Sequence, residues 1–425
     1  MTDLLTNLQL RYFGRESRFW LRPFIILAVL LGSFFLGREA SISLIIFLIA
    51  IITALVFLRV PPLAIFPIIL GSFLIRSELG TGTQSSINST MILVAMLLGL
   101  WALEIFSKQR KLYLFYSRVY APLFGLTIVA ILSFIAGQLP WFTFAAPVSI
   151  LAQLGGLVLF LLSAGAFLWV SQYITDIKWL QWMVWVFLGI GGVYMLGKLL
   201  VGDQIGRIIV NEATGSMFWT WFAAIAASQA VFNRNLKPSH RFLVGLLVAI
   251  TLVAGWRNRQ WASGWLPSML AVLVVIFLLN WRIGLFSALI LTGAFLFLNI
   301  DLAREFSAGD WYSLFTRQAA WKIVLGEIVR VNPILGLGPS NYYNYTPLFP
   351  ILGYAVRFNS HNQYIDLIAQ TGFLGLFMYL WLAFEVGRLS WRMIGRAAPG
   401  FEKAYVVGVL GGLAGTRVYR QRDDT

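Results

Sequence analysis

Apolar residues run along this chain in long unbroken stretches, not in the alternation that marks a half-buried β-strand. Segments 41–58 and 266–279 contain no charged residue. A run of about 18 or more apolar residues can cross a bilayer as a helix, because in hydrocarbon every backbone N–H and C=O must be hydrogen bonded inside the helix. The pattern therefore predicts an all-α polytopic membrane protein.

We expect about 12 transmembrane helices of this kind. The predicted spans are 23–37, 41–58, 61–75, 90–106, 119–136, 151–171, 180–200, 215–232, 242–256, 263–280, 283–300 and 364–386, with a shorter apolar stretch at 404–414. The whole chain, 1–425, is predicted to be a single integral membrane domain. It would have a cytoplasmic N-terminal segment at 1–22, one long external loop at 301–363 and a polar C-terminal tail at 415–425.

Composition supports this interpretation. Only 12% of the 425 residues are charged and 59% are hydrophobic, whereas a soluble domain has about a quarter of its residues charged. The net charge of +15 suggests nucleic acid in a soluble chain, but here it favours basic loops facing anionic lipid headgroups. The absence of cysteine excludes thiolate metal sites, and the scattered acidic residues predict neither a metal site nor a cofactor.

The distribution of basic residues predicts the orientation. Arg11, Arg15, Arg18 and Arg22 mark the N-terminus as cytoplasmic, and alternate loops are then rich in Lys and Arg. Two segments assigned to the outside break this rule: the turn after the ninth span and loop 301–363. Either these segments hold an anionic ligand, or the long loop is translocated regardless of its charge.

The long loop contains its own predicted helix. Trp311–Val331 has apolar residues at helical spacing, Asn332 and Pro333 end it, and its Trp and Tyr content suits an amphipathic helix lying along the membrane interface. Arg317 and Trp321 lie four residues apart and so share one face of this helix. Tyr342 follows in an aromatic stretch that either stacks on sugars or packs at the interface.

The chain has two histidines with different surroundings. His240 lies in a basic inside loop, where a solvated interfacial residue is expected. His361 lies at the outer mouth of a span, and its side chain suits proton transfer near neutral pH. A polar residue that only caps the helix start is an equally good interpretation. Arg257 and Arg259, flanked by tryptophans, either anchor a helix end or bind phosphate.

Three segments, in order, resemble the O-antigen ligase and O-antigen polymerase family of bacterial envelope glycan enzymes. The segments are Arg257–Trp261, then Arg317 and Trp321 followed by Asn332–Gly338, and then Ser360–Tyr364 with Gln370–Leu376. The first departs from the family pattern at Asn258 and Gln260, so either Arg257 or Arg259 is the matching arginine, and Arg259 is favoured.

The resemblance implies metal-independent, inverting glycosyl transfer on the outer, periplasmic face of the bacterial inner membrane. The donor would be a glycan on undecaprenyl diphosphate, and the acceptor a sugar hydroxyl on lipid A core or on a second lipid-linked glycan. His361 is the expected catalytic base. Arg259, Arg317 and Arg257 are the expected diphosphate-binding residues, and Trp321, Asn362 and Tyr342 are expected to support the substrate.

One alternative from another class is a transporter or flippase of lipid-linked oligosaccharide. That class predicts charged residues inside the spans and internal repeat symmetry, and the sequence shows neither clearly. Ligase and polymerase activity are not separated by these motifs.

Overall fold

The computed structural model describes residues 59–76, 78–80, 86–108, 117–209, 214–257, 262–297 and 311–416. The predicted spans at 23–37 and 41–58 lie outside these residues. The chain divides into two compact units, Met1–Leu63 and Ala64–Thr425.

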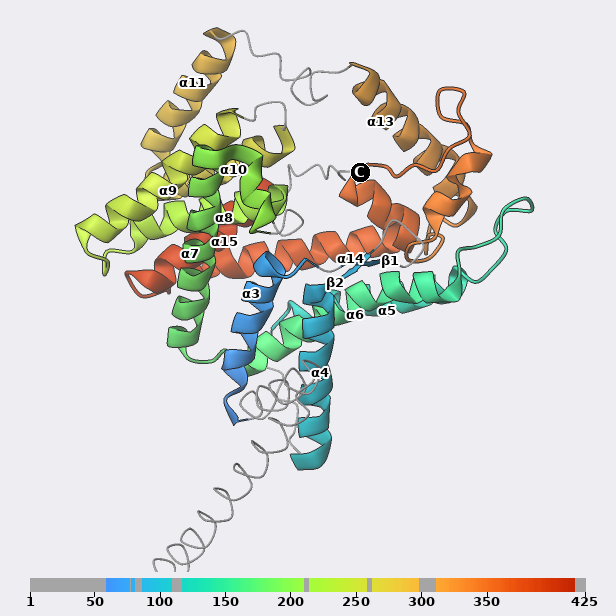
Figure 1. The fold of residues 1–425 in the computed structure, drawn as a ribbon, viewed down its shortest axis with the longest axis horizontal. Coiled ribbons are helices and arrows are strands. Elements are labelled where there is room, and N and C mark those ends of the chain that lie inside the picture. Colours follow the sequence, from blue (N-terminus) through green and yellow to red (C-terminus); the bar gives the residue numbers. More distant parts are fainter. Residues whose placement is uncertain are drawn as a thin grey trace, which may run out of the picture. The chain divides into compact units, whose positions relative to one another are not determined.

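The described part is built almost entirely from helices (Figure 1). In chain order the elements are η1 (Pro61–Ala64), α3 (Ile65–Leu74), β1 (Glu78–Gly80), β2 (Ser86–Asn88), α4 (Ser89–Lys108), α5 (Tyr120–Ala136), α6 (Ile150–Tyr173), α7 (Ile177–Val201), η2 (Gly202–Arg207), α8 (Ser216–Phe232), α9 (Pro238–Arg257), α10 (Ala262–Leu279), α11 (Trp281–Phe297), α13 (Trp311–Ile323), η4 (Val324–Ile328), η5 (Val329–Val331), η6 (Tyr342–Leu348), α14 (Gln363–Ile394) and α15 (Phe401–Thr416).

Five of these helices, α4, α6, α7, α9 and α14, are long and apolar enough to cross a membrane. Five shorter apolar helices, α3, α5, α8, α10 and α11, coincide with other predicted spans. The chain is thus a helical, multi-pass membrane protein, as the sequence predicts. The count of about 12 spans stays a prediction.

Two local features were not predicted from the sequence. A short antiparallel ribbon pairs β1 with β2 between α3 and α4, with Glu78 opposite Asn88. The helix expected over Trp311–Val331 is present, but it changes from α in α13 to π in η4 and to 3-10 in η5. Such π turns are often found at functional sites.

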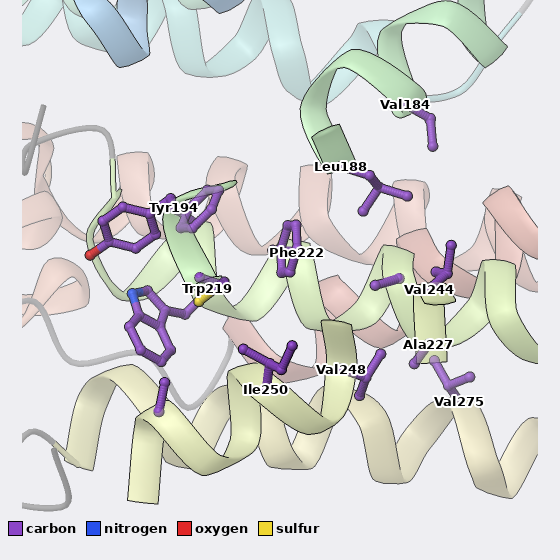
Figure 2. Close-up of a cluster of buried hydrophobic side chains, with 14 of the residues drawn as sticks. Val184, Leu188, Tyr194, Trp219, Phe222, Ala227, Val244, Val248, Ile250 and Val275 are labelled. Atoms are coloured by element: carbon purple, nitrogen blue, oxygen red, sulfur yellow. The ribbon is translucent and has the colours of Figure 1, made fainter. Parts of the chain in front are cut away.

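Helix α8 is enclosed by α7, α9, α10 and α15. Its Trp219 and Phe222 are fully buried, and so are the small residues Ala223, Ala224 and Ala226. Figure 2 shows side chains of α7, α8, α9 and α10 meeting in this cluster. The alanines beside these rings allow neighbouring helices to approach α8 closely, as small residues do at helix interfaces in membranes.

Helix α15 fits between α8 and α10 because one of its faces carries no side chains. Gly408, Gly411, Gly412 and Gly415 recur every three or four residues along it. A Cβ on Gly411 would lie 3.0 Å from the carbonyl oxygen of Ala271 in α10. The apolar stretch expected at 404–414 is therefore a packed helix that begins at Phe401 and continues to Thr416.

Hydrogen bonds between helix ends agree with alternating crossings. Arg257 at the end of α9 donates to the carbonyl of Leu199 near the end of α7 (3.1 Å). At the opposite ends, Arg241 donates to the carbonyls of Ala230 and Val231 (2.9 and 3.1 Å). Each bond joins helix ends that the basic-residue pattern assigns to the same side.

Candidate functional site

The turn Pro333–Gly338 docks onto a break in α14 at Gly372. This glycine has a φ of +68°, so the helical hydrogen-bond ladder is interrupted there. The loop supplies hydrogen-bond donors at the break: Leu337 N donates to Ala369 O (2.9 Å), and Gly338 N donates to Gln370 O (3.1 Å). Two of the sequence segments that carry the family resemblance are therefore one structural unit.

The same loop is fixed on its other side to the turn between α5 and α6. The Asn341 side chain donates to Gly137 O (3.1 Å) and accepts from Val148 N (2.9 Å). Gln153 is fully buried and donates to Val148 O (3.0 Å), which adds a further hydrogen bond to this turn. The loop after Asn332 is therefore hydrogen bonded on two sides rather than a free connection.

Ser360, immediately before His361, is held at each of its polar atoms. Its N–H donates to the Tyr342 hydroxyl (3.1 Å), and its carbonyl accepts from the Trp321 indole N–H (2.7 Å). Its hydroxyl donates to Asp366 Oδ1 (2.6 Å) and accepts from Asn362 N (3.1 Å). Ser360 is 0% exposed, so these bonds lie away from solvent.

Tyr342 completes this cluster by donating its hydroxyl to Asp366 Oδ1, the atom that Ser360 also contacts. Burial, and then the charge of Asp366 and its hydrogen bond, raise the pKa of Tyr342 well above its usual value near 10. The hydroxyl therefore remains a donor at physiological pH. Since Tyr342 is only 4% exposed, its ring lies in the core and any support of a substrate would act through its neighbours.

His361 itself has a φ of +48°, in the left-handed region. A non-glycine residue there costs of order 1–3 kcal/mol, and such strain persists only where the surroundings over-determine it. The flanking contacts do so here: His361 N donates to Asn359 Oδ1 (3.1 Å) and Asn362 caps α14 by accepting from Tyr364 N (3.0 Å). The imidazole is half-buried at the start of α14.

The structure brings together four of the seven residues predicted for the site. Trp321, Tyr342, His361 and Asn362 meet around Ser360. Arg317 is half-buried one helical turn before Trp321 in α13. Arg257 is exposed at the end of α9, where its described hydrogen-bond partner is Leu199, and Arg259 lies outside the described residues.

Two residues of this cluster were missed by the sequence-based prediction. Asp366 was one of several scattered acidic residues, and Ser360 was only part of a motif. An available signal was the position of Asp366 in the first turn of a helix capped by Asn362, where carboxylates are favoured. The position of Asp366 in its helix does not predict its hydrogen-bond partners, because one of them, Tyr342, comes from a separate segment.

Comparison with known proteins supports the resemblance. The family model described as O-antigen ligase matches residues 239–380, which include all seven predicted site residues. No curated protein gives a significant match to the chain. The resemblance predicted from the sequence is thus confirmed: residues 239–380 of this multi-pass membrane protein match the O-antigen ligase family.

Proposed function

We propose that this protein is a glycosyltransferase that moves a glycan from undecaprenyl diphosphate to a sugar hydroxyl at the bacterial inner membrane. The acceptor would be lipid A core for a ligase, or a second lipid-linked glycan for a polymerase. The observation that carries this proposal is His361, a half-buried imidazole on strained backbone inside the matched family domain. Strain of this kind is concentrated at functional sites.

In the proposed reaction His361 removes the proton of the acceptor hydroxyl as that oxygen attacks the anomeric carbon. The glycosidic bond to undecaprenyl diphosphate breaks at the same time, and negative charge grows on the departing diphosphate. Arg259 and Arg317, helped by Arg257, stabilise that charge, so the reaction does not require a metal ion. Attack from the side opposite the diphosphate inverts the anomeric centre.

The proposal includes a topology of about 12 spans with the candidate site on the outer, periplasmic side. The hydrogen bonds of Asn341 to Gly137 and Val148 support it, because they join loop 301–363 to a turn that alternation also assigns to the outside. The basic segment 1–22 would then lie on the cytoplasmic side, as predicted from the sequence.

Reconstitution tests the reaction. Full-length protein in lipid vesicles, given an undecaprenyl-diphosphate-linked glycan and an acceptor, is expected to release undecaprenyl diphosphate and to yield a glycan on the acceptor. A product on lipid A core identifies a ligase, and a longer lipid-linked glycan identifies a polymerase. Movement of the donor across the bilayer with its diphosphate bond intact would instead indicate a flippase and contradict the proposal.

Cysteine labelling tests the orientation, since the native chain has no cysteine. Arg357, in the long loop, and Lys237, between α8 and α9, are both exposed. We expect Arg357→Cys to react with a membrane-impermeant maleimide in intact spheroplasts, and Lys237→Cys to react only after permeabilisation. The opposite pattern would place the candidate site on the cytoplasmic side.

A further inference from the structure

Three separate elements converge on the residue before His361. Trp321 comes from α13, Tyr342 from the start of η6 and Asp366 from the first turn of α14. Their bonds to Ser360 use its carbonyl, its N–H and its hydroxyl respectively. A residue fixed at three atoms by three elements has little freedom to rotate its backbone.

The position of Ser360 in the chain makes this arrangement relevant to His361. The φ of His361 is a rotation about the bond that follows the Ser360–His361 peptide unit, and the Ser360 carbonyl belongs to that unit. Asn362, on the other side, is fixed as the N-cap of α14. Both peptide neighbours of the imidazole are therefore held, and the left-handed conformation at His361 is the one that joins them.

We propose that Asp366, Tyr342 and Trp321 are positioning residues that hold Ser360 and thereby fix the His361 imidazole at the acceptor hydroxyl. This inference rests on the proposed function, in which His361 is the base. It assigns the three residues no contact with the reacting atoms. Asp366 acts as a hydrogen-bond acceptor for Tyr342 and Ser360, not as a second base.

The chain offers a matched pair of variants for Tyr342. Tyr342→Phe removes only the hydroxyl that joins Ser360 to Asp366. The neighbouring Tyr343 is similarly buried (6% exposed), and within the described residues its hydroxyl makes no hydrogen bond, so Tyr343→Phe is the control. We expect Tyr342→Phe to lower kcat by about 10²-fold with KM for the donor unchanged, because misplacing a reacting group by about 1 Å has an effect of that size. Tyr343→Phe should match the wild type.

Substitutions of Asp366 distinguish a positioning role from direct participation in glycosyl transfer. Asp366→Asn keeps an oxygen that accepts from both hydroxyls, whereas Asp366→Ala removes it. A positioning role predicts that Asn restores most of the activity that Ala loses, since neutral hydrogen bonds are about half as strong as charge-assisted ones. An equal, complete loss in both variants would show that the charge or the proton of Asp366 takes part in the reaction, and would overturn its assigned role.

Thermal unfolding of each full-length variant is measured in detergent together with its transfer activity. This measurement identifies variants that fail to fold. For such a case Trp321→Phe tests the same inference, because it keeps an aromatic ring and removes the N–H bonded to Ser360 together with one ring of the indole. Wild-type kcat in folded Tyr342→Phe and Trp321→Phe, with His361→Ala inactive, would overturn the positioning role and leave the proposed function intact. Activity in His361→Ala would overturn the proposed function itself.

Discussion

Replacing His361 with alanine is expected to lower glycan transfer by about 10²–10⁴-fold at unchanged protein abundance, the range that removal of a general base produces. Without this imidazole, no base removes the proton of the attacking hydroxyl in the proposed reaction. His361→Asn should lose as much. Asparagine tolerates left-handed backbone better than other non-glycine residues, so this variant keeps the local conformation and removes the base. Transfer is measured as release of undecaprenyl diphosphate from reconstituted protein.

The other histidine is the control for this experiment. His240 is exposed in the first turn of α9, at the end that the topology assigns to the cytoplasm. His240→Ala should transfer glycan at the wild-type rate. Equal activity of the His361→Ala and wild-type proteins, at equal abundance, would remove the imidazole from the mechanism.

Gly372→Ala is expected to be the most damaging glycine substitution near the site. Gly372 has a φ of +68° and a ψ of −176°, a conformation essentially restricted to glycine that costs other residues about 1–3 kcal/mol. A Cβ here would also overlap the backbone carbonyl of Ile334, which adds about 1–3 kcal/mol of overpacking. Backbone cannot move aside as a flexible side chain does, so loop Pro333–Gly338 should separate from the break in α14. We expect a thermal midpoint well below that of the wild type, with transfer activity reduced in step.

Gly387, further along the same helix, is the matched control. A Cβ on Gly387 meets no described atom within 4 Å, and its position in the helix favours alanine over glycine by up to about 1 kcal/mol. Gly387→Ala should therefore match the wild type or exceed its thermal midpoint. Membrane proteins often unfold irreversibly, so the two midpoints are compared at one scan rate. Equal midpoints for the Gly372→Ala and Gly387→Ala proteins would contradict the docking role of Gly372.

The break in α14 shows why the span was only partly predictable. Hydropathy located it at 364–386, and the helix runs from Gln363 to Ile394. The interruption at Gly372 is invisible to a hydropathy pattern, because glycine is also a common residue in unbroken membrane helices. Its meaning depends on Pro333–Gly338, whose N–H groups satisfy the carbonyls that the break releases.

Sequence patterns did predict the elements that depend on local physics. Continuous apolar runs predicted α4 to α11 closely, since a helix that crosses hydrocarbon must satisfy its own backbone. The end of the helix over Trp311–Val331 at Asn332 and Pro333 was also predicted, because proline cannot continue a helix. The three ordered segments led to the family whose model matches residues 239–380.

By itself, then, the sequence determined that this chain is a helical membrane protein that resembles the O-antigen ligase family, and it predicted His361 as the candidate base of the two histidines. Only the tertiary structure decided what surrounds His361. The bonds from Trp321 to Ser360 and from Tyr342 to Asp366 join residues 39 and 24 positions apart. Periodicity reports which face of an element is buried, but the partner of a buried polar group is set by how separate elements fold together.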